Sequence, residues 1–490
     1  MPLKFHSNSL NLCAKAVESS TCSRDIFKGI LKCLLICLSF TDLSAQQSFE
    51  RTIGIYSGSA HSGVSGIELP DTSILAIGSI SDSVQRQKVC LVWTNSRGDT
   101  TRTKIVQPAA LREIASFGLR NDSGSIYVSG RMEDSTTSDA MLLKLDSSGG
   151  VVWRHRLGTT TRNERYNNLC LTNEGNVVGA GRAVEIQSNY YFMKCAALHS
   201  SGIPIWTKEW RTRLGEINSI CEGADSSFYA TGYLLDFGDT SGSMFLLHIG
   251  ANGDSLWTKK YFGAGWATGN SILCLSDGLL IAGSTSAGSQ LAGDHFLVKT
   301  NFSGDTLWTR TYGFQNLDER TKALSFSSDN CYILCGNSQA YLELIKVDTL
   351  GNQEWKHDYN SGDALGNSVI ATLDSGYLAA GSAGMTTGLP LVYLVKTDET
   401  GGILLGETLP LQLTNEIKVY PNPSEGDLRF MPSELNDVTI TDFSGKIVFR
   451  AKHCSESLEL SSLAAGAYFL FGQTEKGDVM QGKILLIKGN

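Results

Sequence analysis

Short apolar runs alternate with turn residues along most of the chain, and this pattern predicts β-strands. Around residues 270–312 the runs read NSILCL, LLIAGST, HFLVKT and TLWTRTY. Ser-Asp-Gly follows the first run and Ser-Gly-Asp follows the third, and both are typical hairpin-closing sequences. The runs are rich in β-branched and aromatic residues and show no sustained 3.6-residue period, which favours strands over helices.

Two sequence markers recur seven times with a period of about 51 residues. The first marker is a turn glycine followed by a Trp-type position, and its glycines are Gly98, Gly149, Gly202, Gly253, Gly304, Gly351 and Gly401. The second marker is a glycine at the end of an apolar run, at Gly78, Gly130, Gly181, Gly232, Gly283, Gly336 and Gly381. Two independent markers in phase predict seven structural repeats.

Four short strands in each repeat of this length predict an all-β fold, a seven-bladed β-propeller over residues 46–413. A β-solenoid would need a shorter period. The segment Phe49–Tyr56 (FERTIGIY) is similar to the outer-strand sequence WTRTYG, so we expect it to complete the last blade and close the ring. Residues 403–409 (ILLGETL) compete for the same place.

After residue 413 the repeat ends, and residues 414–490 have a different pattern. Short alternating strands are separated by turns every 8 to 12 residues, which predicts a small Ig-like β-sandwich. The chain therefore reads as two folded domains of unequal size.

Composition supports large packed domains and excludes some partners. Only 18% of the residues are charged, 41% are hydrophobic and glycine accounts for 51 residues, so disorder is excluded as the general state. The formal net charge of −8 argues against a nucleic-acid partner.

The first 45 residues are predicted to be a secretory signal peptide. Arg24 and Lys28 precede the apolar run Ile30–Phe40, and small residues lead to a cleavage site after Ala45. The run is too short to span a membrane, which takes about 20 residues. Cleavage would leave 36 basic and 46 acidic residues, a net charge of −10, and no transmembrane segment in the mature chain.

Cysteine usage predicts free thiols more readily than a disulfide framework. Four of the 12 cysteines lie in the leader, and Cys170, Cys221 and Cys274 occupy matching places in successive repeats. Cys331 and Cys335 lie roughly 13 Å apart on one strand and cannot bond to each other. We interpret the remaining cysteines as small buried hydrophobic residues. No Cys/His cluster has metal-ligand spacing, so no metal site is expected.

A basic residue recurs two positions after each Trp-type position. The set is Arg51, Lys104, His155, Lys208, Lys259, Arg310 and His357. A ring of cations could bind an anionic glycan, but basic residues on exposed outer strands also prevent edge-to-edge pairing, and we favour that role. The tryptophan beside each of them is expected to cover the gap between blades.

The loops before the innermost strands vary most, and we expect them to surround one mouth of the central channel. Trp266 lies in a glycine-rich loop outside the repeat pattern and is the best candidate for a ligand-stacking platform. Asparagines at the start of four innermost strands are further ligand-binding candidates: Asn168, Asn218, Asn270 and Asn367. Asparagine at such positions also satisfies backbone groups, which is the structural alternative.

No catalytic residue and no cofactor are predicted. The chain lacks HExxH, a Walker loop and a GxSxG elbow. The primary hypothesis is a non-catalytic binding module for an extracellular glycan or protein. The alternative is a secreted hydrolase or lyase that uses loop carboxylates such as Glu164, Asp318 and Glu319 on a polysaccharide or peptide.

The C-terminal segment resembles the type A C-terminal sorting domain of the type IX secretion system of Bacteroidota. The resemblance rests on Tyr420, Pro421, Asn422, Pro423 and Gly426, then Asp442, Gly445 and Lys446, then Gly466 and Tyr468. It implies export across both membranes, with residues 414–490 binding the type IX translocon as the address. It also implies a cell-surface or extracellular location. The resemblance does not imply any enzymatic activity.

Overall fold

A computed structural model describes residues 48–54, 61–81, 86–107, 112–261, 265–286, 293–314, 317–359, 363–384, 390–403, 417–442, 447–473 and 479–487. The predicted leader, Ala45, Gly445 and Lys446 lie outside these residues. The described residues contain strands and turns, and none of them forms an apolar helix long enough to cross a membrane. The chain divides into two units, Met1–Leu404 and Leu405–Asn490.

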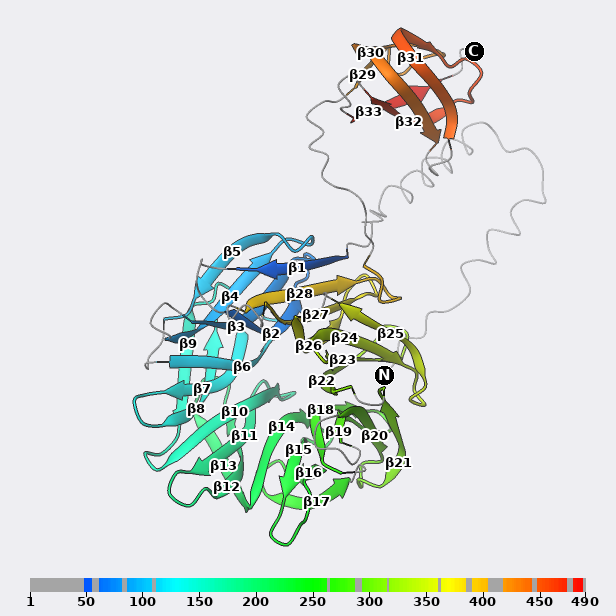
Figure 1. Cartoon of the computed structure of the whole chain (residues 1–490). Coiled ribbons are helices and arrows are strands. Elements are labelled where there is room, and N and C mark those ends of the chain that lie inside the picture. Colours follow the sequence, from blue (N-terminus) through cyan, green and yellow to red (C-terminus); the bar gives the residue numbers. More distant parts are fainter. Residues whose placement is uncertain are drawn as a thin grey trace, which may run out of the picture. The chain divides into compact units, whose positions relative to one another are not determined.

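The first unit consists of seven four-stranded antiparallel sheets arranged around a common axis, which confirms the predicted propeller (Figure 1). Blade 1 contains β2 (His61–Glu68), β3 (Ile74–Ser81), β4 (Gln87–Thr94) and β5 (Thr100–Ile105); blade 2 contains β6 (Arg112–Arg120), β7 (Ile126–Glu133), β8 (Ser138–Leu145) and β9 (Val151–Leu157). Blade 3 contains β10 (Arg162–Leu171), β11 (Val177–Glu185), β12 (Tyr191–Leu198) and β13 (Pro204–Thr212).

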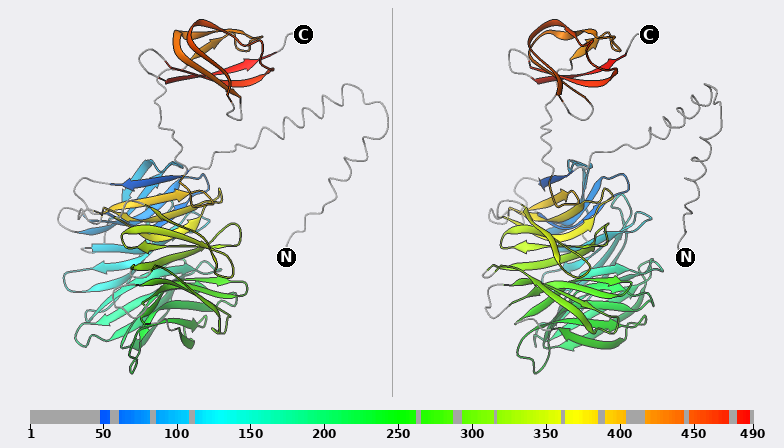
Figure 2. Two further views of the ribbon diagram at one scale, coloured as in Figure 1. Left: turned by 45° about the vertical axis from the view of Figure 1, so that its right-hand side comes forward. Right: turned by 90° about the vertical axis from the view of Figure 1, so that its right-hand side faces the viewer.

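The remaining blades repeat this order from the innermost strand outward. Blade 4 contains β14 (Leu214–Glu222), β15 (Phe228–Leu235), β16 (Ser243–Ile249) and β17 (Ser255–Tyr261); blade 5 contains β18 (Ala267–Leu275), β19 (Gly278–Thr285), β20 (Asp294–Thr300) and β21 (Thr306–Tyr312). Blade 6 contains β22 (Glu319–Phe326), β23 (Tyr332–Ser338), β24 (Tyr341–Val347) and β25 (Gln353–Tyr359). Two further views show the blades stacked side by side around the ring (Figure 2).

Blade 7 joins the two ends of the repeat region. It contains β26 (Ala364–Ala371), β27 (Tyr377–Ala383) and β28 (Leu391–Thr397), and its outer strand is β1 (Phe49–Ile53). β1 pairs with β28 from Phe49↔Lys396 to Ile53↔Val392. The prediction that the N-terminal segment closes the ring is therefore confirmed, and most of the competing segment 403–409 lies outside the described residues.

Adjacent blades are held together where the outer strand of one meets the last turn of the next. Trp206, for example, packs on Gly253, and its indole N–H donates to the Ala251 carbonyl oxygen over 3.0 Å. Tyr261, four residues after Trp257, donates its hydroxyl to the Gly304 carbonyl oxygen over 2.7 Å. The repeat tryptophans thus cover the gap between blades, as predicted, and bury apolar surface that stabilises the ring.

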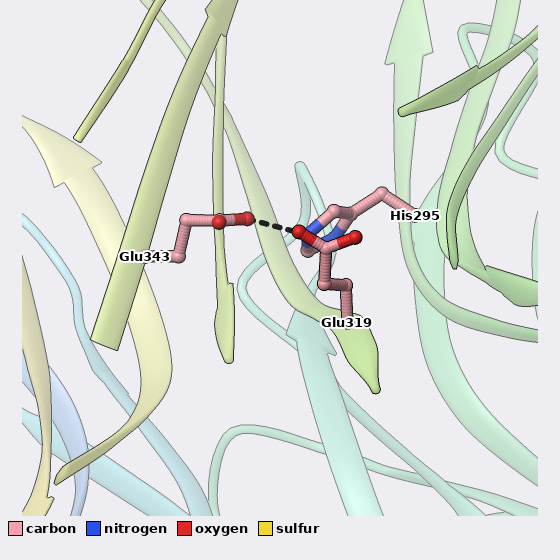
Figure 3. Close-up of side chains that lie close together, drawn as sticks. All are labelled: His295, Glu319 and Glu343. Atoms are coloured by element: carbon pink, nitrogen blue, oxygen red, sulfur yellow. Dashed lines mark ion pairs between the residues drawn. The ribbon is translucent and has the colours of Figure 1, made fainter. Parts of the chain in front are cut away.

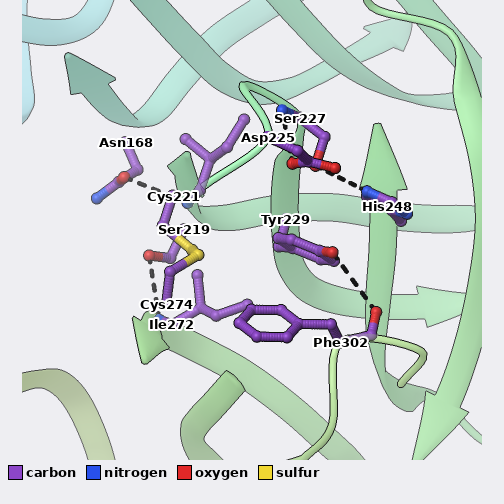
Figure 4. The surroundings of a disulfide bond; sticks show 11 residues. Asn168, Ser219, Cys221, Asp225, Ser227, Tyr229, His248, Ile272, Cys274 and Phe302 are labelled. Atoms are coloured by element: carbon purple, nitrogen blue, oxygen red, sulfur yellow. Dashed lines mark hydrogen bonds between the residues drawn. A yellow bond between two sulfur atoms is a disulfide. The ribbon is translucent and has the colours of Figure 1, made fainter. Parts of the chain in front are cut away.

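A disulfide between Cys221 and Cys274 joins the innermost strands of blades 4 and 5, with the Cα atoms 6.3 Å apart (Figure 4). The interpretation of all the mature cysteines as free thiols is therefore wrong for this pair. Neighbouring blades stack equivalent positions against each other, so two cysteines one repeat apart come within bonding distance. The remaining cysteines of the described chain, including Cys331 and Cys335, are free.

The second unit is a small all-β domain. β29 (Lys418–Tyr420), β30 (Asp427–Asp442), β32 (Gly466–Gln473) and β33 (Val479–Leu486) form a sheet in that order, and β31 (Ile447–Glu459) pairs with β30. Its core includes Phe430, Ile440 and Leu470, each at most 1% exposed. The strands belong to one five-stranded sheet, so the Ig-like arrangement of two sheets stays a prediction.

Candidate functional site on the variable-loop face

The loops before the innermost strands and the loops between the second and third strands of each blade lie on one face of the propeller. Backbone hydrogen bonds connect the two loop types: Ala267 N–H donates to Gly242 O over 3.1 Å, and Glu319 N–H donates to Gly293 O over 2.7 Å. We call this surface the variable-loop face; its described loop residues include 134–137, 158–161, 186–190, 236–242, 265–266, 313–314 and 339–340. The opposite face carries short, regular turns.

Trp266 lies on this face, and 44% of its surface is exposed. Its ring packs on Gly242, where an added β-carbon would lie 2.4 Å from the ring, and its centroid is 6.4 Å from that of Tyr233. Ser286 N–H donates to the Trp266 carbonyl oxygen over 2.8 Å. The ring is therefore supported from below while much of it faces water, which is the geometry that a stacking platform needs.

Other aromatic side chains are exposed in loops of the same face. Phe237 is 58% exposed and lies in the loop 236–242, whose Gly242 supports the Trp266 ring. It forms an edge contact with Tyr190 at 6.2 Å, and the Arg211 guanidinium stacks 3.8 Å from the Tyr190 ring centroid. Phe314, in the loop before blade 6, is 63% exposed. Contiguous exposed apolar surface often marks a binding site, and Tyr190 with Phe237 forms a contiguous exposed pair.

Three of the four predicted asparagines, Asn218, Asn270 and Asn367, lie at the one-residue bulge of an innermost strand, along the inner edge of the ring. Asn218 Nδ2 donates to the Gly269 carbonyl oxygen over 3.0 Å, Asn270 Nδ2 to Thr321 O over 2.7 Å, and Asn367 Nδ2 to Gly63 O over 2.8 Å. Each amide thus connects one innermost strand to the next. These amide N–H groups already donate to backbone carbonyl oxygens. A role of the asparagines in ligand binding stays a prediction.

Asn168 is not the fourth member of this series. The bulge of blade 3 places Asn167 in the equivalent position, and Asn167 Nδ2 donates to the Ile217 carbonyl oxygen over 2.8 Å. Asn168 follows the bulge and accepts a hydrogen bond from Ile220 N–H over 3.4 Å, as Ser219 does from Ile272 N–H (Figure 4). The bulge shifts the register by one residue, which sequence reasoning missed.

The recurring basic residues on the outer strands belong to the contacts between blades. Lys208 Nζ lies 2.6 Å from Asp254 Oδ1, and Lys259 Nζ lies 2.6 Å from Asp305 Oδ1; each aspartate belongs to the last turn of the next blade. These two cations therefore hold neighbouring blades together while they occupy exposed edge strands. An edge-protecting role stays a prediction, and the pairing lies away from the variable-loop face.

A buried charge cluster lies at the junction of blades 5 and 6, where His295 and Glu319 stand at the strand ends next to the variable-loop face. Figure 3 shows His295, Glu319 and Glu343 side by side. His295 Nε2 lies 2.5 Å from Glu343 Oε1, and His295 Nδ1 is 2.8 Å from Thr321 Oγ1. Lys356 Nζ bridges the two glutamates, 2.7 Å from Glu319 Oε1 and 2.5 Å from Glu343 Oε2. The Glu319 and Glu343 side chains have no exposed surface.

The cluster shifts the pKa values of its carboxyl groups in opposite directions. Burial alone would raise the pKa of Glu343, but hydrogen bonds and attraction from His295 and Lys356 outweigh it and leave that pKa lowered. Asp358, an exposed neighbour, has its pKa raised to about 6 by desolvation and by the Glu343 charge. The split follows from the surroundings of each group, since the cations face Glu343 and its negative charge faces Asp358.

His295, Glu319 and Glu343 are close enough together to hold a metal ion. The Lys356 ammonium already occupies the space between the two carboxylates, so an ion would have to displace it. A second group, Asp329, Cys331 and Glu354, is likewise neutralised, because Lys346 pairs with both of its carboxylates. These arrangements fit buried ion pairs that stabilise the blade junctions better than metal centres.

The residues of the C-terminal motif have clear structural tasks. The Asn422 side chain donates to the Lys483 carbonyl oxygen and accepts from Leu485 N–H, both over 2.8 Å, so it extends the edge of β33. Gly426 allows close approach of the Ser461 backbone, and the Tyr468 hydroxyl donates to Ala464 O over 2.8 Å. The exposed Tyr420 ring is accessible to a partner. Asp442 ends β30.

Comparison with protein families identifies the second unit. Residues 418–488 match the family described as the secretion system C-terminal sorting domain. This match confirms the resemblance found in the sequence and indicates export by type IX secretion to the cell surface or the extracellular space. A comparison with curated proteins found no match.

Several solved structures are similar to this chain at low sequence identity. One is a catalytically inactive virginiamycin B lyase from Staphylococcus aureus (9% identity, 71% of this chain and 99% of the other, TM-score 0.44). Another is the β-propeller domain of the trilobed protease from Pyrococcus furiosus (8%, 74% and 99%, TM-score 0.41). A third is the GH93 α-L-arabinofuranosidase of Fusarium graminearum (9%, 57% and 91%, TM-score 0.43). No activity is transferred from them.

Proposed function

We propose that this chain, exported by the secretion machinery that reads its sorting domain, binds an extracellular glycan with the variable-loop face of its propeller. The observation that carries the proposal is the set of exposed aromatic side chains on that face. Trp266 is supported by Gly242 and Tyr233, and Phe237 lies in the same loop as Gly242. Sugar rings present C–H groups that stack on such surfaces, and a rigid scaffold keeps the loops in place.

The buried charge cluster favours binding over hydrolysis. Glu319 and Glu343 would be the natural acid and base of a hydrolase, but both side chains are fully buried and both pair with Lys356. Because neither side chain has exposed surface, a polysaccharide cannot contact these carboxyl groups in this structure. The cluster is therefore more consistent with a structural role, and the hydrolase or lyase hypothesis becomes the second outcome of the test.

The test is a combined glycan and protein array probed with the exported protein and two variants. Trp266→Ala should reduce glycan binding at least several-fold and leave the melting temperature nearly unchanged, because the ring contributes little to the core. Trp308→Ala is the matched control: that ring packs on Gly351 of the next blade, so its loss should cost about 3–5 kcal/mol of stability.

Three outcomes would contradict the proposal. Binding only to proteins would place the ligand in another class, and release of reducing sugar ends from a bound polysaccharide would establish cleavage by a hydrolase or lyase. Unfolding of the Trp266→Ala variant would assign Trp266 to the core and remove the best residue of the binding surface.

A further inference from the structure

At the inner edge of the ring, blade 6 carries a lysine at the bulge position where four other blades carry an asparagine. Bulge positions carry asparagine in blades 3, 4, 5 and 7, and each of these side chains connects neighbouring innermost strands. In blade 6 the register shift between Thr321 and Ala323 places Lys322 in this position. Lys322 keeps exposed surface, and no hydrogen bond or ion pair joins its side chain to another described residue. The repeat therefore exchanges a connecting amide for an unpaired ammonium group.

Further cations gather one step closer to the variable-loop face. Arg165 and Arg320 occupy the same repeat position, two residues before the bulge, in blades 3 and 6. Glu216 occupies it in blade 4, where it pairs with Arg165 over 2.6 Å. Arg182 is the register partner of Arg165 and lies 3.4 Å from the same Glu216 oxygen. We call Arg165, Arg182, Glu216, Asp318, Arg320 and Lys322 the axial rim.

The axial rim carries more positive than negative charge. It contains four cationic and two anionic side chains, and one carboxylate, that of Glu216, serves two arginines. Nε of Arg165 is buried and has no hydrogen-bond partner in the described part of the chain. A local excess of cations is unexpected in a protein with a net charge of −8. An excess of cationic donors over carboxylate acceptors is an arrangement that a bound anion would complete.

The electrostatic environment of Lys322 places it with the rest of the rim. Part of the Lys322 side chain is exposed, but the surrounding strands shield it enough that desolvation, followed by the neighbouring Arg320 charge, lowers its pKa; Glu216 and Asp318 act in the opposite direction. The influence of Glu216 comes from blade 4, two blades away. Tyr233, which contacts Trp266, experiences the charges of Glu216, Arg182 and Arg165, so the rim adjoins the aromatic platform.

We infer that the axial rim binds the anionic groups of an acidic glycan, with Lys322 as the principal contact and Trp266 stacking on a neighbouring sugar. This inference rests on the proposed function and adds the chemical class of the ligand. A carboxylate or sulfate ester on the sugar would receive charge-assisted hydrogen bonds from Lys322 and from the free donors of the arginines. A neutral glycan would leave those donors unpaired.

The test compares three probes by calorimetry on the full chain: oligogalacturonate, its fully methyl-esterified neutral form, and a sulfated galactan oligosaccharide. Lys322→Asn inserts the residue that the repeat uses elsewhere, so the variant should fold. Its affinity for an acidic probe should fall about tenfold, the effect of one charge-assisted contact, and its affinity for the neutral probe should not change. Preference between the carboxylated and sulfated probes distinguishes the two anionic groups.

Lys259→Gln is the matched control, because it removes the same charge from the opposite side of the blade, where Lys259 pairs with Asp305. It should leave the affinity for every probe unchanged. If wild-type protein binds the neutral and acidic forms equally, or if Lys259→Gln weakens acidic binding as much as Lys322→Asn does, the inference is wrong and glycan binding itself stands. If no probe binds to wild-type protein, both proposals fail.

Discussion

The Phe49 ring packs against Gly98, where an added β-carbon would lie 2.6 Å from Cε2 of the ring. Gly98 adopts a φ of +80° in the last turn of blade 1. In other blades a repeat tryptophan packs on the equivalent glycine of the next blade, as Trp206 does on Gly253. Phe49 thus takes the tryptophan position for blade 7. The contact joins the first strand of the propeller to the first blade and the last blade at once.

Phe49→Ala should therefore destabilise the whole propeller rather than one edge. Phe49 is 4% exposed, and a large-to-small change at a buried position costs about 3–5 kcal/mol. Urea unfolding followed by fluorescence measures the loss. The control is Arg51→Ala on the same strand, whose exposed side chain should contribute well under 1 kcal/mol. Equal stability of the Phe49 variant and wild type would show that β1 does not close the ring.

The Cys221–Cys274 bond predicts a redox-dependent stability. Replacing both cysteines with serine, or reducing the protein, should lower the free energy of unfolding by about 2–4 kcal/mol, because the bond closes a loop of 53 residues. Cys90→Ser is the control, since that thiol is buried and free. Peptide mapping under non-reducing conditions should find one linked pair; a bond to Cys170 instead would change the assignment.

Asp358 should make the protein less stable as the pH rises from about 4 to about 6. Its pKa of about 6 in the folded state exceeds that of an unfolded aspartic acid, about 3.9, so the folded state holds the proton more tightly. That stabilisation is present below pH 4 and is lost above pH 6. Asp358→Asn should thus gain about 1 kcal/mol at pH 7, a reduced value for an exposed group, and nothing at pH 4.

Thermal unfolding at several pH values measures this difference. Asp122→Asn, an exchange at an exposed turn position, controls for the change in net charge. A constant difference between the Asp358 variant and wild type across this pH range would contradict the coupling to Glu343.

The sorting domain should be necessary for surface delivery and unnecessary for the propeller fold. Deleting residues 414–490 removes the segment that matches the sorting family and leaves the described blades complete. The truncated protein should remain in the periplasm with an intact propeller. Cell fractionation and protease accessibility measure this, and normal amounts of truncated protein at the surface would contradict the sorting assignment.

Repetition made the architecture predictable. A marker that occurs seven times fixes the blade boundaries, and Phe49 could be placed because its strand is similar to the outer strands of the other blades. The exposed position of Trp266 followed from its place outside that pattern. The disulfide was also within reach, since the Cys221–Cys274 spacing equals one repeat and stacked blades bring such positions together.

The charge cluster and the axial rim could not be predicted in the same way. His295, Glu319 and Glu343 lie on three different strands, and only the register of two blades brings them together. The bulge in blade 3 moved the series from Asn168 to Asn167, a shift of one residue without a local sequence signal. Lys322 has no recognisable sequence signal of its own, because it only replaces the asparagine of other repeats and belongs to no local motif.

The most direct test of glycan binding on the variable-loop face follows Trp266 itself. The protein is labelled with 5-fluorotryptophan, and the Trp266 signal is assigned as the ¹⁹F resonance missing from the Trp266→Ala spectrum. Titration with oligogalacturonate should shift that resonance and leave the interblade tryptophans such as Trp308 unchanged, because their rings pack on neighbouring blades. A titration that saturates while the Trp266 resonance stays in place, or one that shifts only the interblade tryptophans, would contradict the account.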